Sequence, residues 1–138
     1  MSLPAGVHCI PLAPSVEEYR ALRVLAGLSP KTAEAAARGL PNTVFGVSLR
    51  EDDRLLAMGR LIGDGSCFLQ VVDIAVVPDR QGQGLGKAVM AELDAWLHAN
   101  AQGAYVSLIA DGQAHRLYAQ FGFTVTAPRS VGMAKVVA

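Results

Sequence analysis

The chain has 138 residues, enough for one domain with a sizeable core and too few for two ordinary domains. Hydrophobic residues make up 51% of it and charged residues 17%, a balance that excludes an intrinsically disordered chain. Its 12 basic and 12 acidic residues cancel, so overall charge favours neither nucleic acid nor an anionic membrane as a partner. We therefore expect a single domain over residues 1–138 that binds neither.

The compartment is predicted from what the chain lacks. No stretch reaches the roughly 18 uninterrupted apolar residues of a membrane span, and no basic region followed by an apolar one opens the chain. Cys9 and Cys67 are isolated, each in an apolar strand pattern, and no Cys/His spacing of the zinc type occurs. We expect a cytoplasmic protein with no metal and with both cysteines as buried free thiols.

The first part of the chain predicts a short strand and two helices. Residues 6–11 have the pattern of a strand. Ser15 and Glu18 have the spacing of a capping box and open an amphipathic helix that ends at Gly27. Ser29 before Pro30 predicts the N-cap and first position of an alanine-rich helix over residues 31–38.

The remaining elements form a meander followed by alternating strands and helices. Residues 43–49 and 55–62 predict an antiparallel pair, and a tight turn at Asp64 leads into a third strand over 67–77. A helix over about 84–100 then crosses to a strand over 105–110, which should be parallel to the third strand. A short helix over 113–121 and closing strands over 123–125 and 133–137 complete the order.

A glycine-rich loop joins the third strand to the long helix. It contains Gly82, Gly84 and Gly86, which let a ligand approach the backbone closely. The first N–H groups of a helix have no partner inside the helix, and the helix start carries a partial positive charge. The loop therefore predicts a site for phosphate or pyrophosphate, with Arg80 and Lys87 as charges at its rim.

Two common phosphate-binding motifs do not fit this loop. A P-loop needs glycine at the position of Gln81 and Ser or Thr at the position of Ala88. The dinucleotide fingerprint needs a third glycine where Lys87 stands and an acidic residue about twenty residues further on, where none occurs. The loop belongs to neither class.

The pattern that remains is Gln81-x-x-Gly84-x-Gly86 after an apolar strand. It resembles the Gln/Arg-x-x-Gly-x-Gly/Ala signature of the GNAT superfamily of N-acetyltransferases. Residues 111–123, Asp-Gly-Gln-Ala-His-Arg-Leu-Tyr-Ala-Gln-Phe-Gly-Phe, look like that family's Asn-x-x-Ala-x-x-Leu-Tyr-x-x-x-Gly-Phe block. The two blocks occur in the family's order and together span about residues 69–123.

The resemblance implies an α/β (α+β) fold, a single-domain GNAT-like mixed, mostly antiparallel sheet of about six to seven strands flanked by about four helices. It also implies that the strands on either side of the long helix splay apart and admit the pantetheine arm of acetyl-CoA, the acetyl donor. The family's cofactor contacts fall on Ile74, Ala75, Val76, Gln81, Gly82, Gln83, Gly84, Leu85, Gly86, Lys87 and Asp111. Among these, the loop would hold the pyrophosphate and the strand would polarise the thioester carbonyl through a backbone N–H.

Asp111 departs from the family's asparagine. It keeps the acceptor oxygens but lacks the amide donors that would contact the pantetheine arm. The alternative is that it only caps the short helix that begins near Gln113.

Two catalytic roles are expected. Tyr118 matches the family's tyrosine, whose phenol protonates the departing thiolate; its reference pKa of about 10 keeps it protonated until then. The alternative is that Tyr118 only packs beside Phe121 and Phe123. An amine with a pKa of about 10.4 must lose a proton before it attacks, and Asp73 is the only acid on the third strand. We expect Asp73 to act as base or to bind the amine; the alternative is that it is only a hydrogen-bonded residue of the strand.

The predicted function is an N-acetyltransferase that moves the acetyl group of acetyl-CoA to a primary amine by direct attack in a ternary complex. No Ser or Cys nucleophile with a base is evident, which suits a mechanism without an acyl-enzyme. A small-molecule amine is favoured, because a chain of this size offers little surface for selecting a peptide. The alternatives are a protein or peptide N-acetyltransferase, and a non-catalytic acyl-CoA-binding sensor module.

The acceptor itself has no signature in the sequence. Its pocket should be built mainly by the two amino-terminal helices and the loop around Pro128. Neutral overall charge does not favour a strongly charged acceptor, although local charge can override this. A homodimer through an exposed strand edge is compatible with the sequence.

Overall fold

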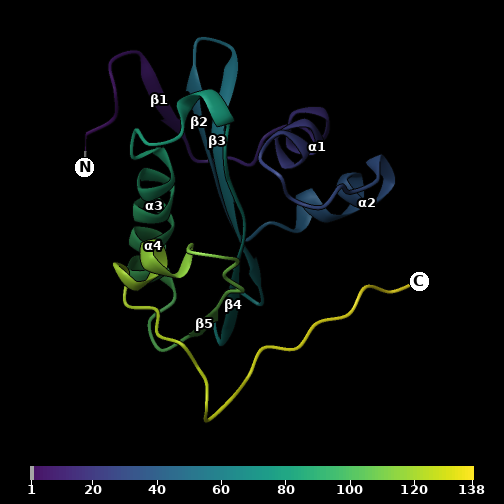
Figure 1. Ribbon diagram of the computed structural model, residues 1–138, viewed down its shortest axis with the longest axis vertical. Helices are drawn as coiled ribbons and strands as arrows, with labels where there is room; N and C mark the ends of the chain where they lie inside the picture. Colours follow the sequence, from purple (N-terminus) through teal and green to yellow (C-terminus); the bar gives the residue numbers. More distant parts are fainter. Residues whose placement is uncertain (1) are drawn as a thin grey trace. The chain divides into compact units, whose positions relative to one another are not determined.

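The computed structural model describes residues 2–138, which form two compact units that meet in sequence between Leu108 and Ile109. The first unit contains one five-stranded sheet in the order β1-β2-β3-β4-β5. Its strands are β1 Val7–Ile10, β2 Phe45–Glu51, β3 Arg54–Gly63, β4 Phe68–Val76 and β5 Tyr105–Ser107. Its helices are α1 Val16–Leu25, α2 Ala33–Gly39 and α3 Leu85–Asn100, with 3₁₀ turns η1 Leu40–Asn42 and η2 Pro78–Arg80 (Figure 1).

The strand pairing follows the sequence prediction. Strands β1 to β4 are antiparallel neighbours, and β5 is parallel to β4. The turn before β4 is fixed by Asp64, whose Oδ1 accepts the backbone N–H groups of Ser66, Cys67 and Phe68 at 2.8, 2.8 and 3.1 Å. The parallel pairing arises because α3 carries the chain back along the sheet before β5 begins.

Helices cover both faces of this sheet. Helix α3 packs against β2, β3 and β4, whereas α1 and α2 pack on each other and α1 on β4 from the other side (Figure 1). On the α3 face, a Cβ at Gly59 would lie 2.5 Å from Val89 and 2.6 Å from Ile74, so glycine allows α3 to approach the strands. The side chains of Val47, Leu49, Leu56, Met58, Leu61, Leu85, Val89, Met90 and Leu93 are at most 1% exposed and form the core.

Helix α1 begins as predicted and is tied to the sheet by an ion pair. The capping box of Ser15 and Glu18 is present. Glu18 also accepts two hydrogen bonds from Arg50 of β2, at 2.6 and 2.7 Å. These bonds lower the pKa of the Glu18 carboxyl to about 2. The pair therefore fixes α1 over the sheet at neutral pH.

The start of α2 differs from the prediction. Its N-cap is Thr32, which accepts the Ala35 N–H at 3.0 Å, and the helix begins at Ala33. Ser29 lies three residues before this N-cap, and it instead accepts hydrogen bonds from Arg23 through its carbonyl, at 2.8 Å, and its hydroxyl, at 3.0 Å. The residues from Ser29 to Thr32 are thus a connection between α1 and α2.

The second unit contains helix α4, His115–Ala119, and extended chain. The closing strands predicted over 123–125 and 133–137 are wrong: these residues join no ladder, so the described sheet has five strands instead of six or seven. Their apolar side chains Val125, Met133, Val136 and Val137 are 74% to 96% exposed. Apolar, β-branched sequence favours a strand, but a strand forms only where a neighbour pairs with it.

Two further findings concern the compartment predictions. Cys9 is partly buried, but Cys67 is exposed just before β4 begins, so the expected burial of Cys67 is wrong. Within residues 2–138, no helix is long and apolar enough to cross a membrane.

Candidate active site

The glycine loop presents a row of unpaired backbone N–H groups at the start of α3. Within the described chain, the N–H groups of residues 82–87 have no hydrogen-bond acceptor; the first bonded one is Ala88, which donates to Gly84 O at 3.0 Å. Gly84 is the N-cap, with φ of 80°, and a Cβ built on it would meet nothing within 4 Å. A side chain at this position would fill the space in front of these donors. Because glycine leaves that space open, a phosphate group can occupy it.

Side chains around the loop hold it in this shape. Gln81 Nε2 donates to the carbonyl of Val76 at 3.2 Å and so ties the loop to the end of β4. Arg80 donates to Glu51 and to Gln83, both at 3.0 Å. The charge of Arg80 is therefore balanced by Glu51, and the exposed Lys87 is the cation left to face a phosphate group.

The edge of β4 next to this loop is open. The parallel ladder pairs only Phe68, Leu69 and Gln70 with β5, whereas β4 continues to Val76. Strand β5 ends at Ser107, short of the predicted 105–110, so residues 71–76 of β4 have no ladder partner on this side; the splaying of the two strands stays a prediction. Residues Ile74, Ala75 and Val76 lie on this unpaired edge, where extended backbone can form hydrogen bonds with the amides of a ligand.

Asp73 precedes these residues and lies at an irregularity in the sheet. Its φ is 63°, and the β3–β4 register shifts between Met58 and Arg60, opposite it. Its side chain is 3% exposed. Arg60 Nε donates to Oδ2 at 2.7 Å, while Tyr19 Oη, at 3.0 Å, and Arg23 Nη1 donate to Oδ1.

This environment makes Asp73 an anchor of α1. Its carboxylate joins Tyr19 and Arg23 of α1 to Arg60 of β3 through charge-assisted hydrogen bonds. Burial, and then the Asp73 carboxylate, raise the pKa of Tyr19, which keeps its phenol available as a donor. The role of Asp73 as base or amine-binding group stays a prediction.

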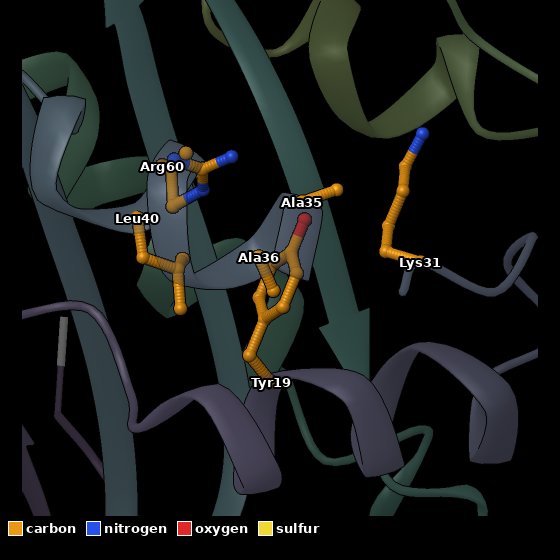
Figure 2. Close-up of a pocket in the computed structure, with 7 residues that line it drawn as sticks. Tyr19, Lys31, Ala35, Ala36, Leu40 and Arg60 are labelled. Carbon is orange, nitrogen blue, oxygen red and sulfur yellow. The ribbon is translucent and has the colours of Figure 1, made fainter. Parts of the chain in front are cut away.

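A pocket of about 140 Å³ adjoins this cluster between α1, α2 and β3. Its lining residues are Tyr19, Lys31, Ala35, Ala36, Gly39, Leu40 and Arg60 (Figure 2). The sequence predicted that the amino-terminal helices build an acceptor pocket, but it did not single out these side chains. A signal for one of them was present: Arg60 is a charged residue in the interior of β3, whereas the other arginine of the strand, Arg54, is at its exposed first position.

Asp111 and Tyr118 lie in the second unit. The Tyr118 ring packs edge-on against Phe123 at 6.4 Å, and its hydroxyl has no hydrogen-bond partner in the described residues. Burial, and then the Asp111 carboxylate, raise the pKa of Tyr118. The capping alternative for Asp111 is wrong, because no side chain caps α4, which follows Ala114.

Comparison with known proteins identifies the fold and the family. The model of the acetyltransferase (GNAT) domain family matches residues 43–125. A structure from meticillin-resistant Staphylococcus aureus, described as a probable acetyltransferase of unknown function, is 47% identical with a TM-score of 0.91, and the match covers 95% of this chain and 99% of that one.

Curated plant relatives match about half of this chain. Histone acetyltransferase TAP1 of Glycine max is 37% identical over 73 residues, which are 53% of this chain and 31% of that protein. The chloroplastic GCN5-related N-acetyltransferase 2 of Arabidopsis thaliana is 35% identical over 74 residues, 54% of this chain and 28% of that protein. The matched region thus spans less than a third of each curated relative. On the family match and the likeness to the Staphylococcus structure, the chain belongs to the GNAT family of acetyltransferases.

Proposed function

We propose that this protein transfers the acetyl group of acetyl-CoA to the primary amine of a small molecule by direct attack in a ternary complex. One observation carries this proposal: a row of unpaired N–H groups, residues 82–87, next to an unpaired strand edge, residues 71–76. The first feature suits a pyrophosphate and the second suits the amide-containing arm attached to it.

The chain would hold the donor in two places. The N–H groups of residues 82–87 and the charge of Lys87 would bind the pyrophosphate, with the partial positive charge of α3 adding to the attraction. The backbone of Ile74, Ala75 and Val76 would align the pantetheine arm. A backbone N–H of these residues would donate to the thioester oxygen, which gains negative charge as the amine attacks. Acetyl-CoA itself supplies the activated acyl group.

Tyr118 would complete the reaction by protonating the departing thiolate, and the proton that the amine nitrogen loses would pass through solvent and restore the phenol. Its raised pKa keeps the phenol protonated well above neutral pH, so the proton is present when the carbon–sulfur bond breaks. Asp73 sits one residue before Ile74, and we assign it to holding the acceptor side of the site. Asp111 would contact the pantetheine arm through its acceptor oxygens.

The experiment combines donor binding with turnover. Calorimetry measures acetyl-CoA binding, and release of free CoA thiol measures transfer to a panel of small amines that also contains a lysine peptide, because one relative is named a histone acetyltransferase. We expect binding and turnover with small amines. Binding without turnover on any amine would instead support the sensor alternative, and turnover on the peptide alone the protein alternative.

Tyr118→Phe tests the acid. Loss of the phenol proton should lower kcat roughly tenfold or more and leave acetyl-CoA affinity unchanged. Tyr105→Phe, which removes a hydroxyl from an exposed residue of β5, is the matched control and should have wild-type kcat. An unchanged kcat in Tyr118→Phe would remove this residue from the mechanism.

A further inference from the structure

We propose that the pocket between α1, α2 and β3 recognises an anionic group of the acceptor, so that the preferred substrates are small amines that also carry a carboxylate or a phosphate. The proposal rests on the proposed function and specifies its acceptor.

Its first support is the balance of charge around the pocket. Arg23 and Arg60 share the one carboxylate of Asp73, and both arginines are 8% exposed. Two buried cations against one anion leave an excess positive charge, and Lys31 adds another among the lining residues, none of which is acidic. Burying charge without a partner is costly, so an anion entering the pocket would gain more than at an exposed lysine.

The second support is a free donor on Arg60. Its Nε donates to Asp73 at 2.7 Å and its Nη1 to Thr43 at 2.8 Å. In the described part of the chain, Nη2 of Arg60 has no hydrogen-bond partner. Every buried side-chain nitrogen or oxygen there does have a partner, so Nη2 must lie on accessible surface. Arg23 differs, because Nε, Nη1 and Nη2 all donate to Ser29 or Asp73. Arg60 is therefore the arginine with a group to offer to a ligand.

The third support is preorganisation and space. The Arg60 guanidinium lies 5.4 Å from the centre of the Tyr19 ring, and Tyr19 in turn donates to Asp73, so the cation is held from two sides. Figure 2 shows Tyr19 extending from α1 and the short side chains of Ala35 and Ala36 near it. The volume of about 140 Å³ is far above the roughly 15 Å³ that one water requires.

The position of the pocket fits an acceptor. Asp73, which binds Arg60, directly precedes Ile74, the first residue of the segment assigned to the thioester. An acceptor whose anionic group binds Arg60 could thus place its amine, a few bonds away, at the unpaired edge of β4. The phosphates of acetyl-CoA are assigned to the other end of that segment, at residues 82–87.

The test uses matched acceptors and a charge reversal outside the Asp73 cluster. Calorimetry on the CoA-loaded protein compares 2-aminoethyl phosphate with ethanolamine, and β-alanine with its amide. Binding and kcat/KM should favour the anionic member of at least one pair roughly tenfold or more, since charge-assisted hydrogen bonds are strong. A preference in the first pair would identify the recognised group as a phosphate, and a preference in the second pair would identify it as a carboxylate. Equal affinity within both pairs would overturn the proposal.

Lys31→Glu should then reduce that preference by about fivefold through KM, with kcat and acetyl-CoA affinity unchanged. Arg38→Glu is the matched control, an exposed charge reversal on α2 that does not line the pocket, and it should leave the preference intact. Equal effects of the two reversals would contradict the proposal. Because acetyl-CoA binding is measured separately, its absence would refute the proposed function, whereas loss of the anion preference alone would refute only this assignment.

Discussion

The glycine loop and the pocket between α1, α2 and β3 are both suited to anions, but they are built from different atoms. Residues 82–87 form one continuous stretch and offer backbone N–H groups, which any residue except proline supplies. The pocket is lined by side chains that include Tyr19, Lys31 and Arg60, and the adjoining cluster adds Arg23 and Asp73, so the groups come from four separate parts of the chain. The loop should therefore respond to changes in backbone shape, and the pocket to changes in charge.

The largest expected effect is on the Asp73 cluster beside the pocket. Asp73→Asn removes the negative charge between two buried arginines and should lower the free energy of unfolding by about 3 kcal/mol. Urea denaturation measures this. Asp79→Asn is the matched control, because Asp79 pairs with Arg54 in an exposed ion pair, and its effect should be much smaller. Similar losses in both variants would show that Asp73 is not the central anchor.

The next effect concerns the loop. Gly84→Val places a branched side chain in the space before the N–H groups and should weaken acetyl-CoA binding by roughly a hundredfold or more. Gly103→Val is the matched control for strain, because Gly103 also has positive φ, 87°, and open space around it. It should destabilise the fold to a similar degree and keep wild-type affinity. Undiminished affinity in Gly84→Val would refute the pyrophosphate assignment.

The smallest effect is a pH dependence of the helix that carries part of the pocket. The pKa of Glu18 falls from 4.5 in its reference state to about 2 in the fold, so its ion pair with Arg50 contributes stability above pH 4.5. That contribution is lost as the pH drops from about 4.5 to 2. Since the carboxyl is one-third exposed, we expect a loss of only about 1 kcal/mol.

Glu18→Gln isolates this contribution. Glutamine keeps the capping-box acceptor but does not titrate, so the difference in unfolding free energy between wild type and variant should shrink between pH 5 and roughly pH 2. A difference that stays constant over this range would mean that the Glu18–Arg50 pair adds nothing. Thermal unfolding at a series of pH values provides the measurement.

Local chemistry allowed the sequence alone to determine much of the first unit. Apolar alternation predicted the meander, the Ser15–Glu18 spacing predicted the start of α1, and the glycines at a strand-to-helix junction predicted the loop. Each of these depends on neighbours within a few residues. The family resemblance could be seen for the same reason, because its motifs are short and continuous.

The tertiary structure decided what depends on distant partners. Ser29 has the sequence of a helix cap, but its hydroxyl accepts a hydrogen bond from Arg23 instead. Asp73 is the only acid on its strand, and only the fold brings Tyr19, Arg23 and Arg60 into contact with it. The segments 123–125 and 133–137 have strand composition but join no ladder. Hydrogen bonds and ion pairs between residues far apart in sequence form only once the backbone has brought them together, and no local pattern encodes which partner will arrive.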